Sequence, residues 1–126
     1  MLADWQGAAD AVLVDAPCSG TGTWRRNPEA RWRLDEAELA RLASLQDRLI
    51  DIAAELVKPG GRIGFVTCSL LDIEGKDRID AALERNPKLL PKSIELPLGR
   101  VRGHGIRFSP YHDATDGFFV AMLAVG

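Results

Sequence analysis

Two cysteines and one aspartate stand at the ends of short apolar runs, where reactive side chains commonly gather. Asp15 follows Val12-Leu13-Val14, and Cys18 lies three positions later in a Pro-Cys-Ser-Gly stretch. Cys68 ends the run Arg-Ile-Gly-Phe-Val-Thr-Cys at 62–68. A cysteine thiolate is a nucleophile. Neighbouring strands lie about 4.8 Å apart, so two such strands would bring both thiols and the carboxylate to one edge of a sheet, where open α/β folds bind ligands.

The segments between these residues predict a strand, a helix and a second strand. Residues 11–15 are short and apolar, as in a buried strand. Between Asp35 and Val57, apolar residues recur every three or four positions, which indicates a helix with one buried face. Asp35 and Glu38 resemble a capping box, and Lys-Pro-Gly-Gly at 58–61 ends the helix. With the strand at 62–68 this makes a βαβ unit, whose two strands are expected to be parallel.

The remainder of the chain predicts a second helix within 73–86 and two strands near the carboxyl end. The helix is expected to bury Ile79, Ala82 and Leu83, although Gly75 weakens its first turn. Residues 117–123 and 103–110 are expected to pair as an antiparallel ribbon at a sheet edge, and 87–102 show no clear pattern. The predicted fold class is α/β: a parallel βαβ unit followed by an antiparallel edge ribbon.

Composition places the chain among ordinary globular proteins. It has 126 residues, 46% hydrophobic and 27% charged, which fits one domain. It contains no apolar run of membrane-spanning length and no secretion signal, so we expect a cytoplasmic protein without a membrane partner. A net charge of −2 excludes a uniformly basic nucleic-acid binder, but arginines cluster within 25–33 and 100–107. Such clusters can contact phosphates, and a solvated surface is the alternative.

Several other interpretations of the cysteines remain open at this point. A single cysteine is most often a small buried hydrophobe, and two are too few for a disulfide framework. The spacing of His104 and His112 from the cysteines matches no common zinc pattern, and no Cys-x-x-Cys is present. We therefore predict no metal site and expect loop or structural roles for both histidines. Trp32 is either a packing residue or, beside arginines, a platform for bases.

Three segments together resemble the Sun (Fmu) family of RNA cytosine-5 methyltransferases. VLVDAPCSGTGTWRRNPEARW, at 12–32, is similar to the family's motif IV. LQDRLIDIAAELVKPGGRIGFVTCSL, at 45–70, resembles the following helix and motif VI, which carries Thr-Cys-Ser. SPYHDATDGFFVAML, at 109–123, resembles the carboxyl-terminal motif. The three matches follow the family's order and span nearly the whole chain, and Asp-Ala-Pro-Cys-Ser-Gly followed by Thr-Cys-Ser is a specific combination.

This resemblance implies methylation of cytosine carbon 5 in RNA, with S-adenosylmethionine as the methyl donor. Thr-Cys-Ser implies that Cys68 is the nucleophile that adds to carbon 6, and Pro-Cys implies that Cys18 assists elimination of Cys68 and product release. Asp15 is expected to hydrogen-bond the base or the cofactor, and Pro17 to turn its loop toward them. In DNA cytosine-5 methyltransferases the Pro-Cys cysteine is the nucleophile, so exchanged cysteine roles are the main mechanistic alternative.

The resemblance also implies an RNA partner and a fold that extends beyond these motifs. Ribosomal RNA is the expected substrate and transfer RNA the alternative; the target base must be unpaired or flipped out. The candidate RNA-binding residues are Arg25, Arg26, Trp32 and Arg33.

The family's cofactor loop, which is rich in glycine and precedes motif IV, has no counterpart in the chain. We therefore expect residues 1–126 to form a partial Rossmann-like class I methyltransferase domain that is inactive by itself. The exposed edge of the strand at 11–15 predicts self-association. A non-catalytic RNA-binding or assembly module that retains the fold is the alternative function. The family's Glu-Glu-Asn-like stretch is replaced by Ile-Glu-Gly-Lys-Asp at 73–77, so no role is carried over to that segment.

Overall fold

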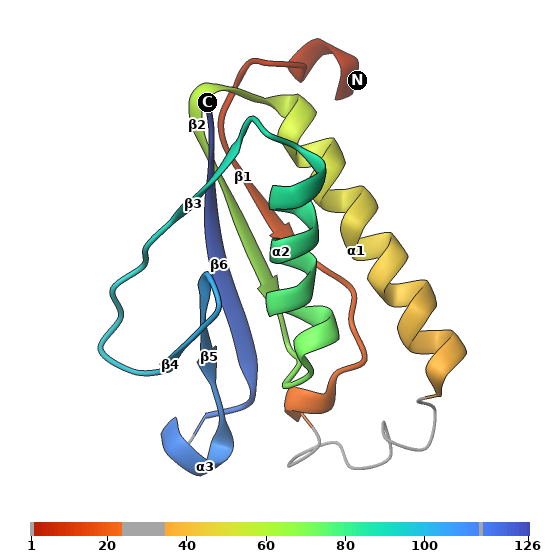
Figure 1. Ribbon diagram of the computed structural model, residues 1–126, viewed down its shortest axis with the longest axis vertical. Coiled ribbons are helices and arrows are strands. Elements are labelled where there is room, and N and C mark those ends of the chain that lie inside the picture. Colours follow the sequence, from red (N-terminus) through yellow and green to blue (C-terminus); the bar gives the residue numbers. More distant parts are fainter. Residues whose placement is uncertain (1, 24–34, 114) are drawn as a thin grey trace.

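A mixed sheet organises the chain (Figure 1). The computed structural model describes residues 2–23, 35–113 and 115–126. Within them the six-stranded sheet has the order β1-β2-β6-β5-β4. β3 also pairs with β6, along residues 122–125, whereas β5 pairs with residues 118–121 of the same strand. The strands are β1 (Ala9–Asp15), β2 (Val57–Thr67), β3 (Leu89–Lys92), β4 (Arg100–Arg102), β5 (Gly105–Phe108) and β6 (Phe118–Val125).

The first long helix begins at the predicted residue. The Asp35 side chain accepts the backbone N–H of Glu38 at 2.7 Å, as an N-cap does. Glu38 binds Arg41 instead of reaching back to the cap, so half of the predicted capping box forms. The described helical segments are η1 (Leu2–Trp5), η2 (Thr21–Thr23), α1 (Glu36–Leu56), η4 (Asp72–Glu74), α2 (Lys76–Arg85) and α3 (Pro110–Asp113).

The predicted βαβ unit is confirmed. β1 and β2 pair in parallel, with Val12 opposite Ile63 and Val14 opposite Phe65. The predicted boundary of the second strand was wrong, because β2 begins at Val57 and includes residues 58–61. The pairing is irregular there: Ala9 to Ala11 of β1 face Val57 to Arg62 of β2. Gly60, with a φ of 85°, adopts the left-handed conformation that lets this extra length loop out.

The carboxyl-terminal half is antiparallel, and it contains the predicted ribbon. β6 runs antiparallel to β2 and to β5, so the predicted pairing of 103–110 with 117–123 is confirmed. The predicted place at a sheet edge was wrong, because β2 and β4 flank the two strands. β4 extends this ribbon further, and β3 pairs with the other end of β6. Both strands come from 87–102, where no pattern was recognised. In β3 only Leu89 is buried, so the strand lacks the alternation of buried and exposed residues from which a strand is predicted.

The core lies between the sheet and the two longer helices. α1 and α2 stand side by side over one face of the sheet (Figure 1). The predicted inward residues of the second helix are confirmed, since Ile79 and Ala82 are fully buried and Leu83 packs against the core. Other fully buried core residues are Ile50, Ile63, Phe65 and Leu123.

β1 forms one end of the sheet within the described residues and pairs there only with β2. Val14 is buried, whereas the neighbouring Leu13 is 71% exposed because successive strand residues point to opposite faces. The sheet therefore presents an apolar side chain and an unpaired strand edge at β1. None of the described helices has the length and apolar character needed to cross a membrane.

Candidate active site

The loop that follows β1 lies against the end of β2 and brings the two cysteines together. Ala16 donates its N–H to the carbonyl of Val66 at 3.0 Å, which continues the ladder between the strands. Gly22 then donates to the carbonyl of Cys68 at 3.0 Å. The Cys18 sulfur in turn interacts with the backbone N–H groups of Gly20 and Cys68. The two cysteine loops are thus in direct contact at the carboxyl ends of parallel strands.

The environment of Cys18 favours its protonated form. Both cysteines are half-buried thiols. Burial is the largest influence and raises the pKa of Cys18. The N–H groups of Gly20 and Cys68 act in the opposite direction, while the negative charges of Glu74 and of a Cys68 thiolate raise the pKa further. The net result is a raised pKa, so Cys18 is a thiol at neutral pH.

Two glycines join the carboxyl-terminal motif to the cysteine loops. Gly117 donates its N–H to the carbonyl of Gly22 at 2.6 Å. A Cβ atom placed on Gly22 would lie 2.0 Å from the Gly117 carbonyl oxygen, and one placed on Gly117 would lie 2.6 Å from the Leu70 side chain. Because backbone meets backbone here, both positions require glycine for space. The three segments of the family resemblance therefore meet at one place.

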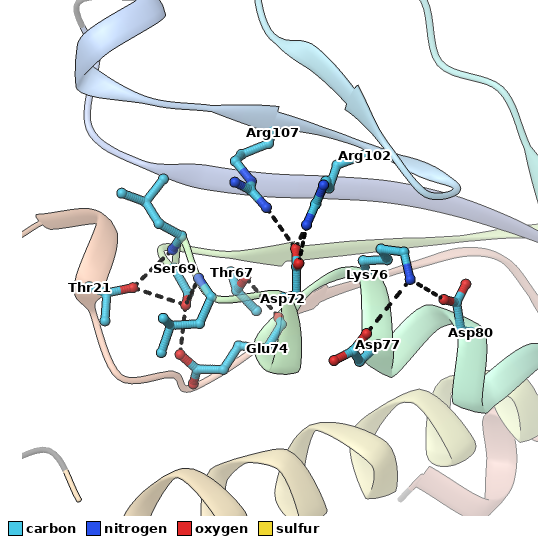
Figure 2. A network of polar contacts seen from close by, with 12 residues as sticks. Thr21, Thr67, Ser69, Asp72, Glu74, Lys76, Asp77, Asp80, Arg102 and Arg107 are labelled. Carbon is cyan, nitrogen blue, oxygen red and sulfur yellow. Dashed lines mark hydrogen bonds and ion pairs between the residues drawn. The ribbon is translucent and has the colours of Figure 1, made fainter.

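A fully buried carboxylate, Glu74, lies beneath both cysteine loops. It accepts the N–H of Ser19 at 2.8 Å, the Ser69 hydroxyl at 2.7 Å and the Gln46 amide at 3.1 Å, and also the Ser19 hydroxyl. Figure 2 shows Ser69 between Thr21 and Glu74. The sequence analysis assigned no role to this residue, which lies in the segment that departs from the family pattern. The two acidic residues at 73–77, Glu74 and Asp77, were the only signal for it, and the sequence does not distinguish them.

A second polar cluster ties the β4–β5 hairpin to the segment that follows the Cys68 loop. Asp72 lies between Arg102 and Arg107 and receives hydrogen bonds from both (Figure 2). The hydrogen bond from Arg102 is the main cause that lowers the pKa of Asp72 to about 2, and Arg107 adds to it. These two arginines of the cluster at 100–107 therefore bind a carboxylate of the same chain.

The other predicted residues are placed as follows. Asp15, the last residue of β1, and Pro17 are both exposed, and the Pro17 carbonyl accepts the Gln46 amide at 2.8 Å. His104 lies in the turn between β4 and β5, as expected of a loop residue, 4.0 Å from Asp80. The candidate RNA-binding residues Arg25, Arg26, Trp32 and Arg33 lie outside the described residues.

The chain is similar to known proteins. The family model described as 16S rRNA methyltransferase RsmB/F matches residues 2–124. Ribosomal RNA small subunit methyltransferase B of Thermus thermophilus is 40% identical over 116 residues, which are 91% of this chain and 29% of that protein.

Two solved structures are similar as well. A structure named PH0851 has a TM-score of 0.88 and 38% identity, and the similarity covers 94% of this chain and 27% of that one. A methyltransferase homologue from Pyrococcus horikoshii has a TM-score of 0.77 and 27% identity, covering 93% and 39%. These likenesses confirm the predicted Rossmann-like methyltransferase fold. The chain spans 29% of the length of its Thermus relative.

Replacing Gly22 by alanine should destabilise the fold through the contact with Gly117. The added methyl group would displace backbone, and overpacking of this kind costs about 1–3 kcal/mol. Urea denaturation followed by circular dichroism measures the loss. Gly64→Ala is the matched control, because the nearest atom to its new Cβ, 3.2 Å away, is the tip of the exposed Leu13 side chain. Equal stability of the two variants would contradict the backbone contact.

The ion pairs of Asp72 predict a pH-dependent stability. The pKa of Asp72 is lowered from 3.8 to about 2, so its charged form stabilises the folded state above pH 3.8, and this contribution is lost as pH falls toward 2. Asp72→Asn should therefore lower the urea midpoint at pH 7 and differ progressively less from the wild type below pH 3.8. Asp77→Asn is the control, because among the described residues its half-exposed carboxylate has only a 3.8 Å ion pair with Lys76 in place of the two arginines of Asp72. A difference that stays constant with pH would refute the assignment.

Proposed function

The chain belongs to the family of 16S rRNA methyltransferases RsmB/F, and on this premise we propose that it supplies the thiol-bearing part of an enzyme that methylates carbon 5 of cytosine in RNA. The observation that carries the proposal is the direct contact between the Cys18 and Cys68 loops at the carboxyl ends of β1 and β2. Covalent catalysis on a pyrimidine needs a nucleophilic thiol, and a second thiol beside it suits the reverse step.

Cys68 is proposed as the nucleophile. Carbon 5 of cytosine is a weak nucleophile, and addition of the Cys68 sulfur to carbon 6 shifts electrons toward carbon 5. Bound S-adenosylmethionine supplies the electrophilic methyl group that carbon 5 then takes. A general base then takes the proton from carbon 5. The electron pair left behind restores the aromatic ring and expels the sulfur of Cys68 from carbon 6 as a thiolate.

Cys18 is proposed to assist that release. Its raised pKa supports this role, because a thiol that keeps its proton at neutral pH is a poor competitor for the base. Its interaction with the backbone N–H of Cys68 keeps it beside the nucleophile. The reversed assignment, with Cys18 as nucleophile, would require the Cys18 thiolate, which the raised pKa disfavours at neutral pH.

Asp15 and Pro17 are proposed to face the methyl donor and the base. Asp15 is an exposed carboxylate at the carboxyl end of β1, the edge at which open α/β sheets bind ligands, and this position fits a group that hydrogen-bonds a polar ligand. Pro17 is exposed in the next turn, and its carbonyl is held by Gln46. The loop between Asp15 and Cys18 is therefore anchored from beneath while its outer side remains accessible.

RNA is the proposed substrate, ribosomal RNA by the family's description and transfer RNA as the alternative. Arg25, Arg26 and Arg33 are proposed to contact phosphates and Trp32 to stack on a base, on the evidence of the sequence alone. The target cytosine must leave any duplex to reach two half-buried thiols.

The covalent step predicts a trapped complex with RNA that carries 5-azacytidine, a base prone to thiol addition at carbon 6. Intact-mass spectrometry should detect the adduct with the wild type and with Cys18→Ala and should find none with Cys68→Ala. An adduct lost only in Cys18→Ala would reverse the two roles. The Thermus relative serves as positive control. If it forms an adduct and this chain forms none, repeating the assay with this chain joined to the remaining parts of the Thermus protein distinguishes a requirement for those parts from a non-catalytic RNA-binding module.

The open edge of β1 predicts self-association, and we propose that a second copy of the chain covers it. An unpaired strand edge readily pairs with another strand, and exposed Leu13 adds apolar surface beside it. Light scattering at increasing concentration should show a rising mass for the wild type. Leu13→Lys should remain monomeric, because a charge on the edge strand opposes pairing. A monomeric mass for the wild type at high concentration would contradict the proposal.

A further inference from the structure

Glu74 is a charged group buried where a neutral one would be less costly. Its side chain is fully buried, and no described lysine, arginine or histidine lies within ion-pair distance of its oxygens. Burial of a carboxylate without a counter-ion opposes folding unless hydrogen bonds replace the lost water. Four donors do so here: the N–H and hydroxyl of Ser19, the hydroxyl of Ser69 and the amide of Gln46. They match the four lone-pair sites of a carboxylate.

Three of the four donors come from the two residues that directly follow the cysteines. Ser19 is next to Cys18 and Ser69 is next to Cys68, so one carboxylate holds both loops. Gln46 reaches the same carboxylate from α1 and also binds the carbonyl of Pro17, immediately before Cys18. Any change in the position of Glu74 is therefore transmitted to both thiols.

The hydroxyl of Ser69 connects this carboxylate to the rest of the Cys68 loop. Ser69 has one hydroxyl hydrogen and donates it to Glu74, so the 3.1 Å contact with Thr21 is a hydrogen bond donated by Thr21 (Figure 2). The oxygens of Thr21 and Ser69 accept the backbone N–H groups of Leu70 and Leu71 at 2.9 Å and 3.1 Å. The network thus fixes the backbone on the carboxyl side of Cys68.

The charge of Glu74 also acts on Cys18 through space. Glu74 and the Cys68 thiol are the ionisable groups that influence Cys18, and the Glu74 charge raises the pKa of the Cys18 thiol. A purely structural acceptor would not need that charge. The negative charge therefore has a chemical consequence at the second thiol in addition to its part in the packing.

We propose that Glu74 is a positioning residue whose carboxylate sets the relative placement of the Cys18 and Cys68 loops and places its negative charge near the Cys18 thiol. The inference rests on the proposed function, in which the two thiols serve different steps on one base. Glu74 acts on the two cysteine loops through its hydrogen bonds with Ser19 and Ser69.

The test is alkylation of each cysteine by iodoacetamide across pH, measured by peptide mass spectrometry. In Glu74→Gln the pH midpoint of Cys18 should fall, and its rate at pH 7 should rise by about two- to tenfold, because the neighbouring charge is removed. Loosening of the fold would also lower the Cys18 midpoint, because burial raises the pKa of this thiol. Ser69→Ala weakens the same network but keeps the Glu74 charge, so it shows how far loosening alone moves the midpoint. Glu84→Gln is the matched control, because Glu84 is an exposed glutamate of α2. Circular dichroism confirms that each variant is folded.

Ser69→Ala keeps the proposal testable if Glu74→Gln does not fold. It retains the Glu74 charge and removes one hydroxyl donor, so Cys68 should react faster at every pH while the Cys18 midpoint stays near that of the wild type. A folded Glu74→Gln with unchanged rates and midpoint, or a folded Ser69→Ala with an unchanged Cys68 rate, would overturn the proposal. Alkylation requires neither RNA nor a methyl donor, so failure of the proposed function, seen as absence of the 5-azacytidine adduct, is a separate result.

Discussion

The contact of two cysteine loops over one buried carboxylate is the interaction on which the site depends. Glu74 receives donors from the loop after β1, from α1 and from the loop after β2, so the βαβ unit must close before its hydrogen bonds can form. The parallel pairing of β1 with β2 supplies that closure, and it places the two cysteines at the same sheet edge. Fold and site therefore depend on each other, because the unit positions the donors and the donors satisfy the buried charge.

The carboxyl-terminal motif contributes to the site of the two cysteine loops because β6 lies beside β2 in the sheet. This pairing delivers Gly117 to Gly22, while Gly22 is also bound to the carbonyl of Cys68. The β4–β5 hairpin is held by Asp72, two residues before Glu74. Segments separated by most of the chain thus converge on the cysteine loops from the sheet side and from the helix side.

The elements most accessible from the sequence were those with a local period or cap. The βαβ unit was predicted from the apolar spacing of α1, the Asp35 cap and the apolar runs of β1 and β2. The positions of the two cysteines then predicted which edge of the sheet carries the site. β3 and β4 were missed because their exposed residues show no alternation. Glu74 was missed because its burial depends on donors 28 and 55 positions away, and no local pattern encodes such contacts. The roles of Cys18, Cys68, Asp15 and the arginines outside the described residues stay predictions.

The most direct measurement locates the covalent bond in the unmodified protein. Wild-type chain trapped on RNA that contains 5-azacytidine would be digested with trypsin and mapped by tandem mass spectrometry. Cleavage after arginine and lysine places Cys68 in the peptide 63–76 and Cys18 in the peptide 1–25. The proposed mechanism predicts the nucleotide on Cys68, within 63–76. A nucleotide found on Cys18 instead would contradict the division of roles between the two thiols.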